Sequence, residues 1–266
     1  MNSSTLSMPT PKQSTLHCPT ASKTSDPMGT NPNRCSTFRF KKFEIENSAS
    51  AMKVGTDGVL LGAWVTADNP QSILDIGAGS GLISIMLAQR FDTSLITGIE
   101  IDPVAAEEAR TNVSVSPWSD RITIECCDFC NWKSDAKFDL IVSNPPFFTN
   151  GIKSPDDSRA SARHATLLSP QSIIEHSVRL LTDNGVLAMI VPAEIVDQLI
   201  FSATLHHLNP REITTVTTRI GKPAKRALIS FTCHTSQLQR SELFISDQSG
   251  FTPQYRNLTK DFYLQF

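Results

Sequence analysis

The sequence contains no long apolar run. No segment approaches the roughly 20 consecutive apolar residues that a membrane-spanning helix needs. The N-terminal stretch also lacks the apolar segment of a secretory signal. Hydrophobic residues make up 39% and charged residues 19% of the 266 residues, which is usual for a globular protein. We therefore predict a soluble chain with no membrane partner and one substantial domain.

Cysteines are few and scattered. The six of them do not have the density of a secreted disulfide scaffold, so the expected compartment is the reducing cytoplasm. Cys127 and Cys130, with Cys126 beside them, have the spacing of a metal or redox pair. No second pair and no histidine cluster completes four ligands, and Cys126 and Cys127 are expected to lie on a buried strand. We therefore predict no metal site.

Positive charge is not in excess either. The formal net charge is −2, so a nucleic-acid partner would have to be held by local basic clusters. Such clusters are more often simply solvated faces. The candidates are Arg39, Lys41 and Lys42, then Arg159, Arg163 and His164, and finally Lys222, Lys225 and Arg226.

Composition divides the chain into a tail and a domain. Residues 1–36 are rich in Ser, Thr, Pro and Asn and nearly lack periodic apolar residues, which predicts disorder. The domain is expected over 37–266, with an N-terminal extension at 37–65 and the core at 66–266. Within the extension, residues 38–51 predict a strand or small hairpin and residues 54–63 a turn followed by a short helix.

Strands and helices then alternate. This order predicts an α/β fold with a Rossmann-like, doubly wound, seven-stranded and mostly parallel sheet. Asp102 is the expected N-cap of a helix that begins with proline, and Asn184 with Gly185 is the expected stop of the helix before them. The predicted strands are 73–76, 95–99, 122–127, 138–143 and 186–191, followed by β-rich segments at 212–219, 226–234 and 243–246, and the predicted helices are 82–90, 103–113, 170–181 and 193–206.

A glycine-rich loop follows the first of these strands. Asp75–Gly81 reads DIGAGSG, and Gly77, Gly79 and Gly81 allow a tight turn whose N–H groups can approach a ligand. A dinucleotide-binding fingerprint would need a glycine where Leu82 stands. The loop therefore does not favour a dehydrogenase.

Acidic residues follow the first three strands in register. Glu100 is placed to accept ribose hydroxyls, and Asp128 to accept an adenine amino group beside the apolar Phe129. Each acid by itself could be a cap, a turn residue or a solvated charge. Together with Asp75 they suit a ligand with a cationic sulfonium, a ribose and an adenine, and not a pyrophosphate. This pattern predicts S-adenosyl-L-methionine as cofactor.

The fourth strand is followed by Asn144, Pro145, Pro146 and Phe147, at the same expected sheet edge. The alternative without a chemical role is a turn that simply ends the strand. The chemical interpretation is that the Asn144 side-chain oxygen and the Pro145 carbonyl accept the two N–H bonds of an exocyclic amine. Its lone pair is then directed at the methyl group while Phe147 stacks on the planar substrate.

These motifs resemble class I S-adenosylmethionine-dependent methyltransferases, through DIGAGSG, GIEID at 98–102, ECCDF at 125–129 and SNPPFF at 143–148. A closer resemblance, from Phe38 to the C-terminus, is to the bacterial tRNA1(Val) (adenine-N6)-methyltransferase family, which modifies the adenine just 3′ of the anticodon. It is carried by FKKFEI at 40–45, MKVGTDGVLLGAW at 52–64, SARH at 161–164, KPAKRALISF at 222–231 and LTKDFYL at 258–264.

The resemblance implies roles for particular residues. Asp75, Gly77, Gly79, Glu100 and Asp128 would bind the cofactor, 144–147 would receive the base, and Thr56 and Asp57 would border the cofactor cleft. The tRNA anticodon loop is then the expected partner, with Arg163 and His164 as the first candidates for phosphate contacts. The oligomeric state is left open.

Other methyl acceptors remain compatible with the NPPF sequence. They are guanine N2 in ribosomal RNA, a glutamine amide in a release factor, and adenine in DNA. The chain has no room for a sizeable DNA target-recognition domain, and a tail stands where the protein-modifying enzymes have a helical N-terminal domain. A non-catalytic RNA-binding relative would be expected to have lost Asn144 or Asp75, and both are present.

Overall fold

The computed structural model describes residues 37–47, 54–146 and 168–266, which belong to one compact unit, Cys35–Phe266. The predicted tail at 1–36 lies outside the described residues. No helix within those three ranges is long and apolar enough to cross a membrane. The division of the domain at residue 65 stays a prediction.

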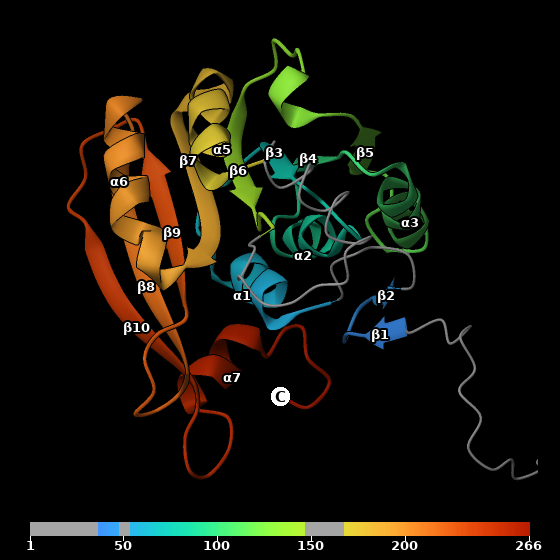
Figure 1. The fold of residues 1–266 in the computed structure, drawn as a ribbon. Coiled ribbons are helices and arrows are strands. Elements are labelled where there is room, and N and C mark those ends of the chain that lie inside the picture. The colour runs from blue at the N-terminus through green and yellow to red at the C-terminus, as the bar shows by residue number, and fades with distance from the viewer. Residues whose placement is uncertain (1–36, 48–53, 147–167) are drawn as a thin grey trace, which may run out of the picture. The chain divides into compact units, whose positions relative to one another are not determined.

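The core of the fold is one sheet whose strand order is β10-β8-β9-β7-β6-β3-β4-β5. Within it β9 runs antiparallel to both neighbours, and every other neighbouring pair is parallel. In Figure 1 the sheet extends from β10 on the left to β5 on the right. The strands are β3 (Ser72–Ile76), β4 (Leu95–Glu100), β5 (Ile122–Cys126), β6 (Phe138–Ser143), β7 (Leu181–Pro192), β8 (Asn209–Arg219), β9 (Arg226–Thr232) and β10 (Gln239–Ser246).

The predicted α/β class with a mostly parallel sheet is confirmed, but the predicted number of seven strands is wrong. The sheet has eight strands, because residues 239–246 pair in parallel with β8 along its length. In sequence this segment carries polar residues at most positions. The sequence predicted only its apolar part, 243–246, and the pairing with β8 identifies the polar residues before Leu243 as part of the strand.

Helices cover both faces of the sheet, as a doubly wound fold requires. Neighbouring strand residues separate into two apolar cores: Ile73 packs in the core that includes residues of α1, α2, α3 and α7, and Leu74 in the core that includes residues of α5 and α6. This alternation is the period of two expected of strands. The helices are α1 (Thr56–Trp64), α2 (Leu82–Arg90), α3 (Pro103–Ser114), α5 (Pro170–Ser177), α6 (Val196–Leu205) and α7 (Pro253–Thr259), with short 3₁₀ turns η1 (Phe129–Asn131), η2 (Val178–Leu180) and η3 (Ala193–Ile195).

Local capping sets the ends of two helices next to the sheet's carboxyl edge. Asp102 is the N-cap of α3, as predicted, and its Oδ1 accepts a hydrogen bond from the Val104 N–H at 2.9 Å. Helix α2 has the predicted bounds. Its N-cap is Gly81, whose φ of 80° lies in the left-handed region that glycine adopts without strain.

The predicted helix at 170–181 corresponds to α5 and the 3₁₀ turn η2, which continues it to Leu180. The predicted helix stop is wrong, because Asn184 and Gly185 lie within β7. The pairing of β7 with β6 shifts register there, and a Cβ on Gly185 would lie 2.9 Å from the Phe138 carbonyl oxygen. The glycine is therefore needed for close packing of two strands, a reason that the local sequence does not reveal.

A two-stranded hairpin precedes the core, as predicted: β1 (Thr37–Arg39) pairs antiparallel with β2 (Glu44–Glu46). Asn112 of α3 holds it in place. The Asn112 Oδ1 accepts from the Glu46 N–H at 2.8 Å, and its Nδ2 donates to the Glu46 and Ser80 carbonyl oxygens, each at 2.9 Å. The hairpin is thus tied to the glycine-rich loop.

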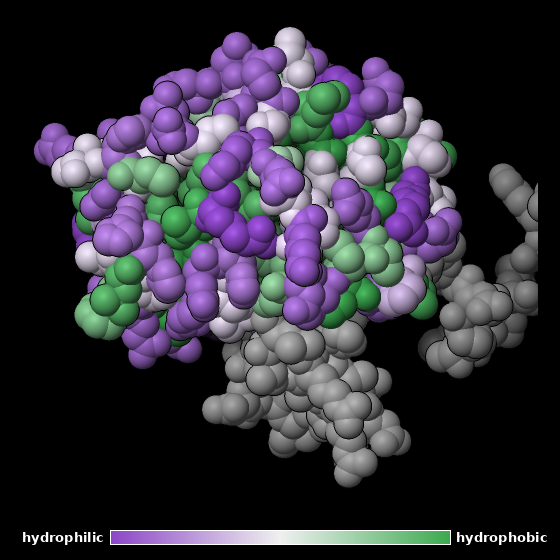
Figure 2. All heavy atoms as spheres, turned by 90° about the horizontal axis from the view of Figure 1, so that it is seen from above, coloured by the Kyte–Doolittle hydropathy of each residue, from purple (hydrophilic) through white to green (hydrophobic). Residues whose placement is uncertain are grey.

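The surface is predominantly hydrophilic on the face viewed in Figure 2, where apolar side chains form small groups between polar ones. Scattered exposed apolar residues are normal on a globular protein. This face therefore gives no sign of an extended apolar interface.

Candidate active site at the carboxyl edge of the sheet

The ends of four parallel strands meet at one edge of the sheet. Ile76, near the end of β3, pairs with Ile99 of β4 and with Ser143 of β6. Glu100 at the end of β4 pairs with Cys126 at the end of β5. The loops that follow these strands are therefore neighbours, as the sequence predicted, and this edge is where ligands bind in open α/β sheets.

The glycine-rich loop directs its first N–H groups toward the protein. Gly77 N and Ala78 N donate to the Ile99 carbonyl oxygen at 2.8 and 3.0 Å, and Gly79 N donates to the Glu100 Oε2 at 2.8 Å. These three N–H groups are therefore engaged within the protein by β4, and a ligand contact of the loop would have to come from its other groups.

Backbone conformation explains the three glycines. Gly77, Gly79 and Gly81 have φ values of 73°, 55° and 80°, all in the left-handed region. A Cβ on Gly79 would meet no heavy atom within 4 Å, whereas one on Gly81 would contact Ala109 of α3. The loop is thus open to space at Gly79 and packed against α3 at Gly81.

Asp75 lies at 0% exposure beneath this loop. Its Oδ2 accepts a hydrogen bond from the Ser84 hydroxyl at 2.7 Å, and its Oδ1 has no hydrogen-bond partner in the part of the chain that the structure describes. Burial raises the pKa of Asp75 from its ordinary 3.8 to about 6, although the hydrogen bonds from Ser84 oppose the shift. The fold thus keeps this carboxyl group buried, at a cost to its ionised form, and leaves one of its acceptor oxygens without a partner among the described residues.

Glu100 is held by backbone donors on both carboxylate oxygens. Oε2 accepts from Gly79 N, and Oε1 accepts from Asp102 N at 2.9 Å. A carboxylate has about four acceptor positions, so each oxygen keeps one for a ligand hydroxyl. The two backbone bonds fix the orientation of the carboxylate that the sequence predicted to bind a ribose.

Asp128 caps the short turn η1. Its Oδ1 accepts from Cys130 N at 3.0 Å and its Oδ2 from the Asn131 side-chain amide at 2.7 Å. Phe129 is only 3% exposed and packs edge-to-face against His176, with 6.1 Å between ring centroids. The structure thus brings Asp128 to the expected edge, while the Phe129 ring belongs to the core and leaves little surface for a ligand.

Asn144 follows β6 directly at this edge and is half-buried, with the buried Pro145 and the half-buried Pro146 after it. The Ser143 hydroxyl donates to the Ile76 carbonyl oxygen at 2.8 Å, which joins the end of β6 to the start of the glycine loop. Phe147 lies outside the described residues.

Thr56 and Asp57 begin α1. Thr56 is exposed, and the Asp57 Oδ2 forms a 2.7 Å ion pair with the Arg226 Nε at the start of β9, both side chains being about 30% exposed. Arg226, predicted as an RNA contact, is therefore engaged within the protein. Asp57 and Arg226 are 169 residues apart in the sequence, and only the fold brings them together.

The remaining basic candidates differ in how the structure places them. Arg159, Arg163 and His164 lie outside the described residues. Lys222 and Lys225 are exposed in the turn between β8 and β9. Lys41 is engaged within the protein, since its Nζ donates hydrogen bonds to the carbonyl oxygens of Lys260 and Phe266.

The cysteines near this edge do not form a metal centre with other described residues: no group of three His, Cys, Asp or Glu side chains is arranged to hold a metal ion in those parts of the chain. Cys126 is exposed, which corrects its predicted burial, and Cys127 and Cys130 are partly buried. Burial raises the pKa of both the Cys127 and the Cys130 thiol, so these groups are poor nucleophiles at neutral pH.

Two residues that support this site were missed by the sequence reasoning. Ser84 binds Asp75, and Asn112 binds the glycine loop. Asn112 stands three residues after Ala109 and seven after Ala105, both on the buried face of α3, and only 1% of its surface is exposed. A polar residue on the apolar face of a predicted helix is a signal that could have identified it.

The acceptor groups at this edge fit a cationic ligand that carries a ribose. An unused Asp75 oxygen, two free acceptor positions on Glu100 and the open space at Gly79 lie around one loop. Three carboxyl groups disfavour an anion and favour a cation. These residues could hold S-adenosyl-L-methionine, whose sulfonium and ribose require this chemistry.

The strand order and this edge define a Rossmann-like methyltransferase fold. The predicted O-methyltransferase Atu636 from Agrobacterium tumefaciens is similar, with a TM-score of 0.60 and 22% identity over 77% of this chain and 96% of that one. M. jannaschii TYW2, solved in complex with AdoMet, has a TM-score of 0.50 and 15% identity, over 74% of this chain and 84% of that one. At these identities the likeness concerns the fold.

Sequence comparison gives the family. Residues 48–210 match the Methyltransferase small domain family. The chain is 42% identical over 228 residues to the tRNA1(Val) (adenine(37)-N6)-methyltransferase of Phocaeicola vulgatus, which covers 85% of this chain and 97% of that relative. The chain belongs to this family of methyltransferases, as the sequence motifs predicted.

Proposed function

We propose that the protein transfers a methyl group from S-adenosyl-L-methionine to N6 of an adenine in tRNA, and that this adenine is position 37, beside the anticodon of tRNA1(Val). The observation that carries the proposal is the hydrogen bond from Ser143 to Ile76, which fixes Asn144 beside the glycine loop. The reaction named for the P. vulgatus relative supports the choice of base.

The cofactor would be held by Asp75, Glu100, Asp128 and the loop of Gly77, Gly79 and Gly81. When bound, S-adenosyl-L-methionine supplies a methyl group on a positively charged sulfur. Glu100 accepts the ribose hydroxyls through the positions that its backbone partners leave open. The Asp75 carboxylate adds negative charge under the cationic end, and Asp128 accepts from the adenine amino group.

The methyl acceptor would be oriented by Asn144 and Pro145. An exocyclic adenine nitrogen is a poor nucleophile because its lone pair is delocalised into the ring. When the Asn144 side-chain oxygen and the Pro145 carbonyl accept its two N–H bonds, the lone pair is directed out of the ring plane. The prolines restrict the backbone that carries both acceptors, and Phe147 would stack on the base. No strong base is needed, because the nitrogen releases its proton after it has become positively charged.

The anticodon loop would be held by basic residues on either side of this edge. Arg159, Arg163 and His164 follow the NPPF sequence along the chain, and Lys222 and Lys225 are exposed near the Asp57–Arg226 ion pair. Their contacts would be to phosphates and would set position rather than sequence choice. The proposed substrate implies action in the cytoplasm.

The experiment is a product analysis. The purified protein is incubated with radiolabelled cofactor and, separately, total tRNA, ribosomal RNA, duplex DNA and release factors, and the digested products are identified. We expect N6-methyladenine in tRNA alone. A tRNA1(Val) transcript with G at position 37 is the matched control and should stay unlabelled. Label found as N2-methylguanine or on protein would overturn the proposal.

A further inference from the structure

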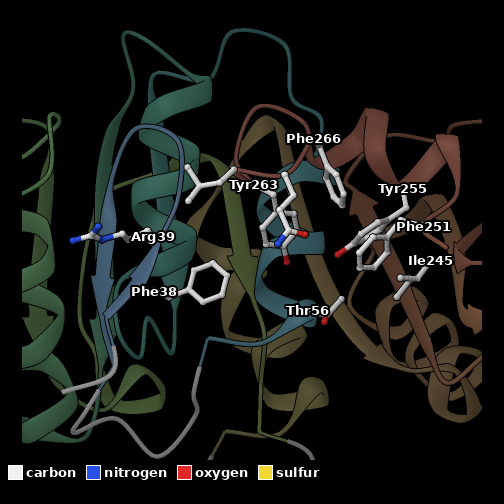
Figure 3. Close-up of a pocket in the computed structure, with 10 residues that line it drawn as sticks. Phe38, Arg39, Thr56, Ile245, Phe251, Tyr255, Tyr263 and Phe266 are labelled. Atoms are coloured by element: carbon white, nitrogen blue, oxygen red, sulfur yellow. The ribbon is translucent and has the colours of Figure 1, made fainter. Parts of the chain in front are cut away.

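A cavity of about 320 Å³ lies outside the site described above. It is formed where segments distant in sequence meet: β1, the first residue of α1, the end of β10 with the loop after it, and the C-terminal segment (Figure 3). Its volume is at the lower end of the range for small-molecule sites. Asn144 and the residues of the glycine loop are not among its described lining residues.

Aromatic rings form most of its wall. Phe38 lies on one side and Phe251 and Tyr255 on the other, with Tyr263 and Phe266 between them (Figure 3). Phe251 is stacked on Tyr255 with 5.3 Å between centroids. Phe38 and Phe251 are nevertheless 38% and 42% exposed, so part of each residue can be reached from solvent.

The lining is free of acidic side chains among the residues described, and it contains one cation, Arg39. The Arg39 guanidinium forms a 3.0 Å ion pair with Glu44, but both groups remain well exposed. Burial raises the pKa of the Tyr255 and Tyr263 hydroxyls, so both stay neutral at physiological pH. The Arg256 guanidinium lies 5.7 Å from the Phe266 ring centroid. The aromatic wall therefore suits a flat group, and the Arg39 guanidinium points away from the rings (Figure 3).

Thr56, the first residue of α1, also lines this cavity. A base held in the cavity would thus lie at the start of α1, the segment that the family resemblance places beside the cofactor cleft. An anticodon loop whose target base is inserted at Asn144 has other unstacked bases nearby in sequence.

We propose that this cavity binds a second, unmodified nucleobase of the substrate RNA by stacking it on the aromatic rings of its wall, which has Phe38 on one side and Phe251 on the other. The proposal rests on the proposed function for the identity of the RNA. Stacking accepts any base, so the cavity contributes affinity and position, and the sequence of the RNA is read elsewhere.

The test uses the full chain saturated with S-adenosylhomocysteine, which keeps the cofactor cleft filled. The probes are the tRNA1(Val) anticodon stem-loop with 2-aminopurine at one loop position at a time, and a single-stranded RNA pentanucleotide that contains 2-aminopurine. We expect the wild type to quench the fluorescence of the pentanucleotide and of one stem-loop position other than 37. Phe38→Ala and Phe251→Ala should each remove that quenching and weaken stem-loop binding about tenfold.

The matched control is Phe201→Ala, since Phe201 is a phenylalanine with 68% exposure on α6. It should leave quenching and affinity unchanged. Because an alanine at 251 could disturb packing, Phe251→Leu keeps the apolar volume without a ring and should behave like Phe251→Ala, whereas Phe251→Tyr should behave like the wild type.

Either of two results overturns the proposal: cavity variants that bind and quench both probes like the wild type, or equal losses in Phe201→Ala. Failure of the proposed function has a different signature. The product analysis would then give no N6-methyladenine in tRNA, while quenching of the pentanucleotide would still depend on Phe38 and Phe251.

Discussion

Two aspartates on neighbouring strands show how differently the two edges of the sheet are built. Asp75 stands near the carboxyl end of β3, is fully buried, and has one oxygen without a partner in the described ranges. Asp139 stands near the amino end of β6. Its Oδ2 accepts from Gln71 N at 2.9 Å and from Ser72 N at 3.1 Å, and its Oδ1 accepts from the Thr182 hydroxyl at 3.0 Å.

The pKa values of the two groups move in opposite directions. Burial dominates at Asp75 and raises its pKa to about 6. Burial also acts upward at Asp139, but the hydrogen bonds from Gln71, Ser72 and Thr182 together outweigh it and lower the pKa. The amino edge is thus satisfied by the protein's own donors and serves stability. The carboxyl edge leaves capacity for a ligand, at some cost in stability.

The largest expected effect is on turnover at the carboxyl edge. Asn144→Ala removes one of the two proposed acceptors of the adenine N–H bonds, and we expect the rate of methyl transfer to fall on the order of 100- to 1,000-fold, by analogy with the loss of other catalytic hydrogen-bonding groups. Cofactor affinity should stay within about twofold. Single-turnover kinetics and calorimetric titration measure the two quantities.

Asn209→Ala is the control for this change, because Asn209 begins β8 and lies outside the candidate site. It should leave turnover unchanged. A parallel loss of turnover and cofactor affinity in Asn144→Ala would mean that Asn144 holds the cofactor and does not orient the base.

The next effect is on stability. Because the pKa of Asp75 is raised in the folded state, this group contributes stability that is fully present below pH 3.8 and lost as the pH rises through about 6. A pKa difference of about 2 corresponds to about 3 kcal/mol. Asp75→Asn should therefore raise the free energy of unfolding at pH 7.5 by up to that amount and by much less at pH 4.5. Urea unfolding at both pH values tests the sign; destabilisation at pH 7.5 would contradict it.

A smaller effect is expected on the cofactor. Asp75→Asn removes the charge beneath its cationic end, and we expect affinity to fall about tenfold at pH 7.5, which is about 1.4 kcal/mol. Wild-type affinity should also decline as the pH falls below about 6, while the variant shows no such decline. Isothermal titration at several pH values measures both.

Asp139→Asn is the matched change at the other edge. It should leave cofactor affinity unchanged and lower stability at pH 7.5 by about 1 kcal/mol, since Asp139 is only partly buried and solvent weakens its hydrogen bonds. Its lowered pKa means that this stability is present above pH 3.8 and lost as the pH falls through the folded-state value. If both variants lowered cofactor affinity equally, the contrast between the edges would fail.

The smallest effect is expected at the ion pair of Asp57 and Arg226. Both side chains are partly exposed, so the pair should contribute less than about 1 kcal/mol to stability. A double-mutant cycle with Asp57→Asn and Arg226→Lys, read by urea unfolding, gives the coupling energy. A coupling near zero, with tRNA affinity lost only in the Arg226 variant, would return Arg226 to the role of an RNA contact.

Much of the fold followed from local patterns. The bounds of α2 and the cap of α3 were predicted because glycine, aspartate and proline act on the backbone within a few residues. The helix before β7 was predicted to within one residue of its end, but its predicted stop was wrong, because Gly185 lies in β7 close to Phe138, far away in the sequence. The last strand was predicted only at 243–246, and its pairing with β8 extends it back to residue 239.

By itself, the sequence determined the fold class, the family and the acids and asparagine of the candidate site, because each follows a strand and parallel strands end at one edge. The tertiary structure decided which groups are already occupied. It assigned the loop N–H groups to β4, Arg226 to Asp57 and the Phe129 ring to the core, and it left one oxygen of Asp75 unused. Hydrogen-bond satisfaction and burial depend on partners from distant segments, and only the folded chain brings those partners together.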